Sequence, residues 1–296
     1  MAVCLYVNIE ELTTEETRKL GLSLLKDPQP GRMAQIGRMK NPSDQARSLG
    51  AGLLLQYMAV KYLKEPSFSD LVNSTATRCM EKEDDPFPPA ELLTVEEIPV
   101  AALLKAVKDT LEEAKELTFG KTEAGSPFVE GLGAFVSLSH KGSLVLCAMA
   151  GRPCGVDIEY TDPAVEDRTS RFSKHQSAEE HTANASEKGK RVCKESGQTQ
   201  GLHVETGRQK RERLASRYFF TEEKQMLEEA SYSQEKWQKT FCRMWCYKEA
   251  YGKMKGTGLK DGLLFNMHGK TKEKVSFYDI HTDFGYVGEL CLLEEN

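Results

Sequence analysis

Apolar and polar residues follow one another along this chain with the two spacings that are typical of strands and helices. Short apolar runs and alternation at every second position predict strands over residues 3–9, 135–138, 144–150, 155–159, 273–279 and 286–293. Apolar residues that recur every three or four positions predict helices over residues 33–63, 99–115, 222–230 and 235–255. Glycine and proline predict turns at 119–121 and 151–153. Because strands and helices do not alternate regularly, this order favours an α+β fold over a doubly wound α/β fold.

Residues 162–213 differ from the rest of the chain in composition. Their large apolar residues are few, namely Val165, Phe172, Val192, Leu202 and Val204. Such a segment cannot bury enough apolar area to offset the entropy lost on ordering it. We therefore predict an insertion without fixed structure, which acts as a linker and not as a recognition element. The basic run at its end, residues 208–213, is predicted to be the solvated start of a helix and not a contact for an acidic carrier protein. Residues 81–90 are charged and broken by prolines, so they are predicted to form an irregular loop.

Charge and composition narrow the classes of function. The formal net charge is −5, which argues against a nucleic-acid binder, because such a protein needs a basic surface. No apolar run is long enough to cross a membrane, and the first residues lack the basic start and long apolar core of a signal peptide. The eight cysteines lack the spacing of a zinc site. A reduced, cytoplasmic setting is therefore expected, without nucleic acid or membrane as a partner.

Two carboxylates in a strand and a charged pair in a helix form the strongest chemical signal. Asp157 and Glu159 are two positions apart, so a strand presents both on one face. Glu249 and Lys253 are four positions apart and share a helix ridge with Trp245. If that ridge covers the strand, three carboxylates meet beside one ammonium. Hard oxygen ligands suit Mg²⁺, which completes its shell with water and phosphates, so the sequence predicts a site for a metal-bound phosphate.

Each part of this pattern also has an ordinary structural explanation. Asp-x-Glu pairs occur by chance in a chain with 29% charged residues, and a Glu–Lys pair four positions apart is usually a solvated helix pair. The flanking residues favour a site, because Asp157 and Glu159 lie between apolar residues and Glu249 lies in a stretch rich in aromatic residues. Charges in apolar surroundings need a partner or a metal.

Several sequence blocks in a fixed order extend this pattern. They are Phe135–His140, Gly155–Glu159, Tyr218–Thr221, Trp245–Ala250, Lys253 and Gly256–Leu259. In this order they resemble the 4′-phosphopantetheinyl transferases, and the long, surfactin-synthetase-activating type more than the short trimeric holo-acyl-carrier-protein synthases. The resemblance spans residues 119–265 and leaves 162–213 unmatched.

The resemblance implies a fold and an activity. The fold is a pseudo-dimer of two similar α+β halves, each a small antiparallel sheet packed on helices, which we place at residues 1–150 and 151–296, with the metal site in the second. The activity is Mg²⁺-dependent transfer of 4′-phosphopantetheine from coenzyme A to a serine of an apo acyl or peptidyl carrier protein, releasing 3′,5′-ADP. Mn²⁺ is the alternative ion, and a monomer is expected. Such carriers serve fatty-acid, polyketide or nonribosomal peptide biosynthesis.

The resemblance also implies roles for individual residues. Asp157, Glu159 and Glu249 are implied to hold the metal. The position of Glu249 on the helix that faces the metal indicates it as the catalytic base, directly or through a metal-bound water. Lys253 cannot be the base while it is protonated, so it is expected to stabilise the leaving 3′,5′-ADP or donate a proton to it. The residues implied in coenzyme A binding are Arg47, Lys121, Ser139, His140 and Lys253. Arg47 is assigned the 3′-phosphate, because a guanidinium fork suits that dianion, and the alternative phosphate contacts are Arg32 and Arg38.

Two other classes of function stay open at this point. A metal-dependent nuclease also carries an acidic cluster followed by a lysine, but that class usually spaces the last pair as Glu-x-Lys, whereas Glu249 and Lys253 are four apart. The acidic net charge disfavours it as well. A catalytically silent relative that only binds carrier proteins needs a lost ligand, and all four residues of the predicted site are intact.

Overall fold

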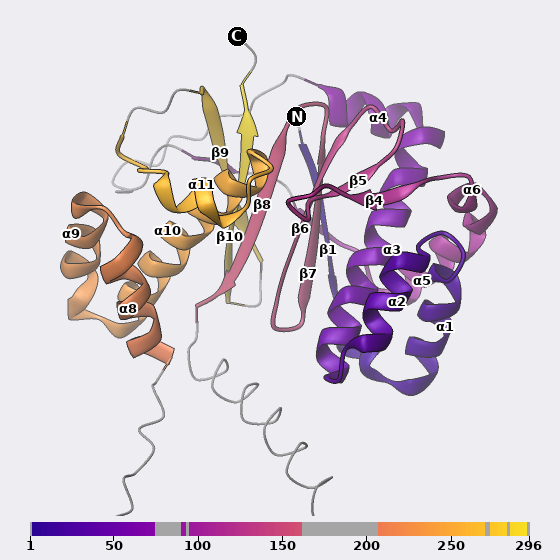
Figure 1. Ribbon diagram of the computed structural model, residues 1–296, viewed down its shortest axis with the longest axis horizontal. Helices are drawn as coiled ribbons and strands as arrows, with labels where there is room; N and C mark the ends of the chain where they lie inside the picture. The colour runs from indigo at the N-terminus through magenta and orange to yellow at the C-terminus, as the bar shows by residue number, and fades with distance from the viewer. Residues whose placement is uncertain are drawn as a thin grey trace, which may run out of the picture.

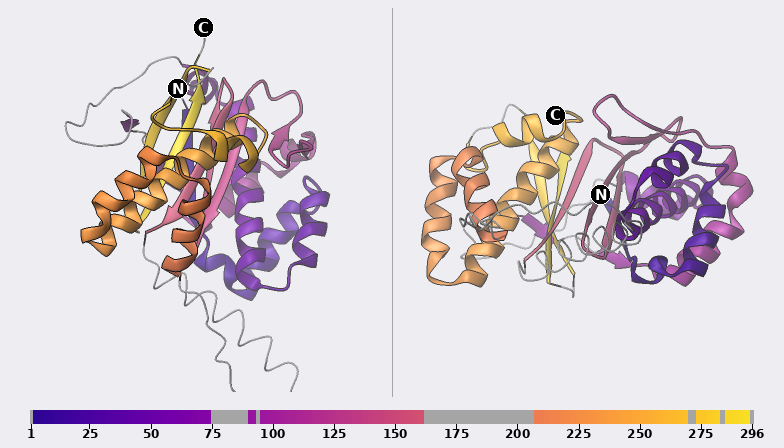
Figure 2. Two further views of the ribbon diagram at one scale, coloured as in Figure 1. Left: turned by 60° about the vertical axis from the view of Figure 1, so that its left-hand side comes forward. Right: turned by 60° about the horizontal axis from the view of Figure 1, so that its bottom comes forward.

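Two small sheets stack face to face, and helices cover the outer face of each (Figures 1 and 2). The computed structural model describes residues 2–74, 90–92, 95–161, 207–269, 273–282 and 285–294. Its mixture of helices with small, mainly antiparallel sheets confirms the α+β class. Within these ranges no helix is long and apolar enough to cross a membrane.

The first sheet has the strand order β3-β1-β7-β6 and lies under the N-terminal helices. Its strands are β1 (Ala2–Asn8), β3 (Val95–Glu97), β6 (Phe135–Lys141) and β7 (Leu144–Ala150). All neighbours are antiparallel except β1 and β3. The helices over it are α1 (Glu15–Leu25), α2 (Pro30–Arg38), α3 (Pro42–Lys64), α4 (Pro66–Asn73), α5 (Val100–Asp109) and α6 (Leu111–Lys115). A short ladder of β4 (Phe119–Lys121) and β5 (Pro127–Val129) precedes β6.

The second sheet has the strand order β2-β9-β10-β8 and carries the C-terminal helices. Its strands are β2 (Ala90–Leu92), β8 (Cys154–Tyr160), β9 (Val275–His281) and β10 (Tyr286–Leu293), with β2 parallel to β9 and the other pairs antiparallel. The helices are α8 (Gly207–Tyr218), α9 (Thr221–Glu229), α10 (Gln234–Met254) and α11 (Leu259–Leu264). Short 3₁₀ turns occur at Glu10–Thr13 and Ala230–Tyr232.

The two halves share one connectivity. In the first, strand β1 is followed by the long helix α3 and the hairpin β6–β7; in the second, strand β8 is followed by the long helix α10 and the hairpin β9–β10. In each sheet the last hairpin strand lies in the middle and pairs antiparallel with both others. This is compatible with the predicted pseudo-dimer. The boundary at residue 150 stays a prediction, and β2, from before it, pairs with β9 in the second sheet.

An apolar layer between the sheets joins the halves. It contains alternate residues of β1 and β7 from one sheet and of β8, β9 and β10 from the other. The outer face of the first sheet packs on α3 and α5, and the outer face of the second packs on α10. Strand β7 is therefore buried on both faces along its whole length, which explains why residues 144–150 form a continuous apolar run.

Three sequence-based expectations need correction. Residues 119–121 form strand β4, not a turn, because Gly120 leaves room for the ring of Phe128 against its backbone. The helix predicted over 33–63 is two helices, since Asn41 caps a new helix by accepting a hydrogen bond from the Ser43 amide, and a proline follows it at position 42.

The third correction concerns the predicted insertion. Its last residues, 207–213, belong to helix α8, where Arg211 is buried against the ring of Phe241. The helix start predicted at 208–213 is thus confirmed, but the run is not wholly solvated, because Arg211 is buried in a helix that is otherwise strongly polar. The rest of the insertion, residues 162–206, and most of the loop at 81–90 lie outside the described residues.

Candidate active site

The edge strands of the two sheets, β6 and β8, are linked by side chains. Every second residue of β6 points toward β8. The hydroxyl of Ser137 accepts a hydrogen bond of 3.0 Å from the backbone amide of Val156, and the hydroxyl of Ser139 donates one of 2.8 Å to Oδ1 of Asp157. Asp157, one of the predicted metal ligands, thus lies buried where the two halves meet.

Helix α10 crosses β8 at very close range because of Gly155. A Cβ on this residue would lie 1.9 Å from the carbonyl oxygen of Ala250 and 2.3 Å from the amide nitrogen of Met254. Only glycine permits this approach. Glu249 and Lys253 each come one residue before these contacts. The regular geometry of the helix therefore turns both side chains toward the strand.

The ammonium of Lys253 is held at three oxygens. Its Nζ lies 2.7 Å from Oδ1 of Asp157, 2.9 Å from the carbonyl oxygen of Val156 and 3.2 Å from Oγ of Ser139. Burial acts to lower the pKa of Lys253, but the carboxylates of Asp157 and Glu249 outweigh it and raise the pKa. Lys253 is therefore protonated at neutral pH.

The three predicted ligands share one electrostatic environment. Burial, and then the charge of Asp157, raise the pKa of Glu159 to about 7. The same two causes raise the pKa of Glu249, while the positive charges of Lys253 and Lys141 partly oppose this rise. The charge of Asp157 thus reaches both glutamates, but no three Asp, Glu, His or Cys side chains of the described residues are gathered closely enough to form a ready ligand set, and the three-ligand site stays a prediction.

These residues nevertheless fit a hard divalent cation. Oδ2 of Asp157 is buried and has no hydrogen-bond partner, which is costly for a carboxylate oxygen. Carboxylate oxygens are the donors that Mg²⁺ and Mn²⁺ prefer. Repulsion among the three carboxylates would fall if a cation lay between them.

His140 and Arg47 lie on the opposite face of β6 from Ser139. Nη1 of Arg47 donates a hydrogen bond of 3.0 Å to the carbonyl oxygen of Gly142, and the guanidinium is ion-paired with Asp44. His140 is exposed, but the protein around it removes part of its hydration, and this desolvation lowers its pKa. The positive charges of Arg47 and Lys253 lower it further. Arg47 therefore places a positive charge near His140, whose lowered pKa favours the neutral imidazole, and both side chains can donate hydrogen bonds to an anionic ligand.

Lys121 is associated with helix α2. Its Nζ donates a hydrogen bond of 3.0 Å to Gln35, and desolvation followed by the charge of Arg32 lowers its pKa. Arg32 itself donates hydrogen bonds to the side-chain oxygen of Gln29, at 2.9 Å, and to the carbonyl oxygen of Ser48, at 3.3 Å. The predicted coenzyme A residues thus fall into two groups, Lys121 with Arg32, and Arg47 with His140.

A buried ion pair behind the site escaped the sequence analysis. Nζ of Lys248 lies 2.9 Å from Glu223, with both side chains fully buried, and it also donates to the carbonyl oxygen of Phe265 at 2.6 Å. The carboxylate of Glu223 accepts a hydrogen bond from the backbone amide of Phe220 at the start of α9. The position of Glu223, three residues into that helix start, was the one available signal. The pair fixes α9 and α11 on α10, one residue before Glu249.

Helix α10 also crosses a row of acidic residues on the second sheet. Asp157, Glu289 and Asp279 lie opposite one another on adjacent strands. Arg243 donates to Asp279 at 3.0 Å and lies 3.6 Å from Glu289. Burial, and then Asp279, raise the pKa of Glu289 well above its usual range. Cations on α10, Arg243 at one end of the row and Lys253 at the other, therefore hold the helix on the sheet.

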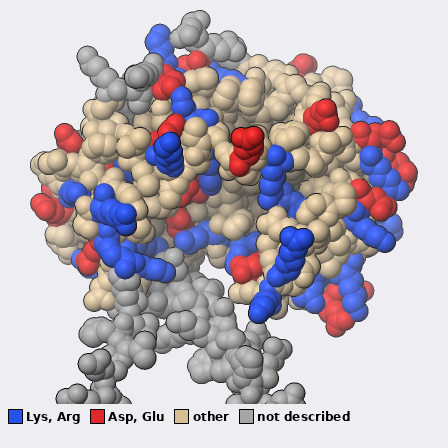
Figure 3. Space-filling model, in the orientation of Figure 1, with Lys and Arg blue, Asp and Glu red and all other residues tan. Residues whose placement is uncertain are grey.

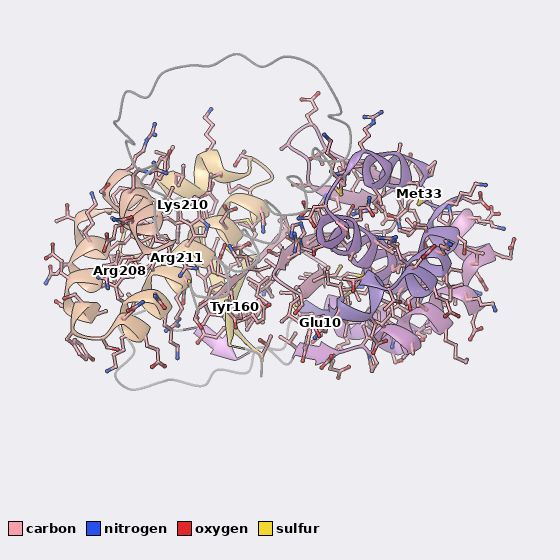
Figure 4. All side chains as sticks on the ribbon, turned by 90° about the horizontal axis from the view of Figure 1, so that it is seen from below. Glu10, Met33, Tyr160, Arg208, Lys210 and Arg211 are labelled. Atoms are coloured by element: carbon pink, nitrogen blue, oxygen red, sulfur yellow. The ribbon has the colours of Figure 1, made fainter. Side chains whose placement is uncertain are left out.

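The basic run at the start of α8 lies near the end of β8 (Figure 4). Arg208 stacks over the ring of Trp237, and Arg211 donates to the carbonyl oxygen of Tyr160 at 3.0 Å. Lys210 is exposed. Part of this run is structural, therefore, and part of it is available to solvent.

The site thus combines the buried Asp157, two glutamates that its charge influences, and a protonated lysine within an α+β fold. Residues 201–289 match the family model of the 4′-phosphopantetheinyl transferase superfamily, and this confirms the resemblance to that superfamily. The matched segment is less than half of the chain; it contains Glu249 and Lys253, and it begins after β8. The long, pseudo-dimeric type stays a prediction. The comparison with curated proteins gives no match.

Proposed function

We propose that this protein transfers 4′-phosphopantetheine from coenzyme A to a serine of an apo carrier protein and releases 3′,5′-ADP, as a transferase of the holo-acyl-carrier-protein synthase type. The observation that carries the proposal is the contact of Lys253 with Asp157 and Ser139, beside two carboxylates whose pKa values are raised. The superfamily match over the helix that supplies Lys253 supports it. We expect a cytoplasmic monomer.

In this proposal Asp157, Glu159 and Glu249 hold Mg²⁺, with Mn²⁺ as the alternative. When bound, the ion neutralises the charge that develops on the bridging oxygen of the pyrophosphate as that bond breaks. The unpartnered Oδ2 of Asp157 supports the assignment of the first ligand. The raised pKa values of Glu159 and Glu249 support the other two, because a cation would relieve the repulsion that raises them.

The protein side chains divide the proton chemistry between them. The carrier serine loses its proton as it attacks the β-phosphorus, and Glu249 is proposed as the base, since its raised pKa brings it nearer to neutral pH. Lys253 stays protonated, so it stabilises the leaving 3′,5′-ADP instead of accepting a proton. Ser139 keeps Asp157 and Lys253 in register by hydrogen-bonding to both.

Coenzyme A is proposed to bind across two groups of residues, Lys121 with Arg32 and Arg47 with His140. Arg47 is proposed for the 3′-phosphate and His140 for the pyrophosphate, because both lie on the same face of β6. Lys121 is proposed for the adenine or a phosphate, with Arg32 beside it as the alternative phosphate contact. An Arg fork and a lysine ammonium are both suited to phosphate oxygens.

The nuclease alternative has less support. On the face of the molecule in Figure 3, acidic and basic side chains are interspersed, without the basic stripe that would follow a nucleic-acid backbone. The silent-relative alternative also has less support, since the ammonium of Lys253 and the carboxylate of Asp157 are already in contact.

Intact-mass spectrometry tests the proposal. Apo carrier proteins of the fatty-acid, polyketide and peptide-synthetase classes are incubated with the enzyme, coenzyme A and Mg²⁺. We expect one phosphopantetheine to be added and 3′,5′-ADP to be released. The control is a carrier in which the acceptor serine is replaced by alanine. No mass gain on any carrier, with folded enzyme, rejects the proposal in favour of a silent relative.

A further inference from the structure

Lys141 is a second ammonium at the site that neither the motifs nor the superfamily match assigns. It is the last residue of β6, on the same side of the strand as Ser139, and its Nζ lies 2.7 Å from Oε2 of Glu159. Its charge also acts on Glu249, which lies on α10. Lys141 therefore contacts one of the two glutamates that are proposed to hold the metal and acts on the other through its charge.

With its three carboxylates ionised, the site carries a net negative charge before an ion binds. Three carboxylates, Asp157, Glu159 and Glu249, face two ammonium groups, Lys141 and Lys253. The side chains of Lys141 and Glu159 are 28% and 16% exposed, so water screens their interaction only in part. A divalent ion among the same three carboxylates would be repelled by both ammonium groups at short range.

Lys253 has anchors that do not depend on a carboxylate. Lys253 donates to two uncharged oxygens, those of Val156 and Ser139, in addition to its contact with Asp157. These hydrogen bonds persist when a metal takes up the charge of Asp157. Lys141 lies at the end of its strand beside the turn at Gly142, and its ion pair is with Glu159, one of the carboxylates that the metal needs. Its long side chain can turn away through its own rotamers.

From this we infer that Lys141 is a built-in counter-ion, which occupies Glu159 in the ion-free protein and must withdraw when the divalent ion binds. This inference rests on the proposed function, because that function supplies the ion. Its consequence is that Lys141 weakens ion binding and raises the concentration of ion that the enzyme needs. A neutral side chain of similar length at this position should bind the ion more tightly.

The test measures Mn²⁺ binding directly, by electron paramagnetic resonance of the free ion, with protein free of coenzyme A. Removal of one unit charge from the site should tighten Mn²⁺ binding by Lys141→Met on the order of tenfold. Lys141→Arg keeps the charge and should bind Mn²⁺ about as wild type does. The matched control is Lys105→Met, which removes a lysine from an exposed ion pair with Asp109 on α5 and should have no effect.

The outcomes separate this inference from the proposed function. Equal or weaker Mn²⁺ binding by Lys141→Met, including no binding by any variant, overturns the inference. Tighter binding by both lysine-to-methionine variants also overturns it, because the effect would then be general charge and not competition at Glu159. Carrier labelling by wild type at saturating Mg²⁺ is scored separately; if it fails while Mn²⁺ binding shifts as expected, the proposed transfer is wrong and the competition stands.

Discussion

At the scale of single residues, Ser139 and His140 show why neighbours in a motif need not act together. Ser139 is buried, and its hydroxyl donates to Asp157 and accepts from Lys253. His140 is exposed on the other face of the strand, near Arg47. The sequence presents them as a pair for phosphate binding, whereas the alternation of a strand sends them to opposite sides. Ser139 contacts the carboxylate and the ammonium, and its role in coenzyme A binding stays a prediction.

Glu159 should make the stability of the ion-free protein depend on pH. Its pKa is raised to about 7 in the folded protein, above the usual value for glutamate. The folded state therefore binds its proton more tightly than the unfolded state does, so the free energy of unfolding falls as the pH rises from about 4.5 to about 7 and levels off above. The loss attributable to this residue is up to about 3 kcal/mol.

Urea unfolding between pH 4.5 and 8 measures this dependence, with Glu159→Gln as the variant. The variant should lack the part of the slope that belongs to Glu159. Exposed Glu113, whose pKa is instead lowered by its hydrogen bond with Lys64, provides the control variant Glu113→Gln. If Glu159→Gln and wild type lose the same stability over this range, then Glu159 is not protonated in the folded protein at pH 6.

Arg47 can be assigned to a ligand group by comparing two substrates. 3′-Dephospho-coenzyme A lacks the phosphate that Arg47 is proposed to contact. Wild type should prefer coenzyme A, and Arg47→Ala should lose most of that preference through a higher KM for coenzyme A, about ten- to a hundredfold for a lost charged contact. The control is Arg217→Ala on α8, in the other half.

Undiminished discrimination by Arg47→Ala would show that the guanidinium serves the β6–β7 turn alone, through its hydrogen bond to the carbonyl oxygen of Gly142. Arg32, which is electrostatically coupled to Lys121, would then be the next residue to test.

At the scale of elements, the contact between α10 and β8 decides whether the site exists. Gly155→Ala would place a Cβ within 1.9 Å of a backbone oxygen, so the helix must shift. We expect a loss of stability of about 3 kcal/mol or more, because the clash is with backbone and not with a flexible side chain. Transfer activity should fall with it, since Glu249 and Lys253 move with the helix.

Thermal unfolding followed by circular dichroism measures that loss. Gly31→Ala on α2 is the matched control, because a Cβ there meets no atom within 4 Å, and it should be neutral or slightly stabilising. Stability unchanged in Gly155→Ala would mean that α10 does not approach β8 this closely.

The elements also show how far the sequence alone can lead. Strong periodicity located α10 and the strands β1, β7, β8 and β10, and with them Asp157, Glu159, Glu249 and Lys253. Polar or short elements were missed, including α1, α4 and α11, because a weak apolar stripe gives little periodic signal. The ion pairs of Lys141 and Lys248 join residues 18 and 25 positions apart, so only the tertiary fold creates them.

At the scale of the whole molecule, the apolar layer between the sheets makes the halves depend on each other. Each half alone would expose one side of that layer, including Leu144, Leu146, Ile158 and Leu290. We therefore expect a single calorimetric unfolding transition for the full chain, with calorimetric and van't Hoff enthalpies that agree. Two separate transitions, or residues 1–150 remaining soluble and folded on their own, would contradict a shared core.

The meeting of β6 and β8 through side chains has a consequence for how this chain can change over generations. Ser139 and Lys141 come from one half, and their partners Asp157 and Glu159 come from the other. A substitution on either strand leaves a carboxylate or a hydroxyl on the opposite strand without its partner. Substitutions in the outer helices can therefore accumulate independently in each half. Between β6 and β8, a substitution of one residue of a pair requires a matching substitution of its partner.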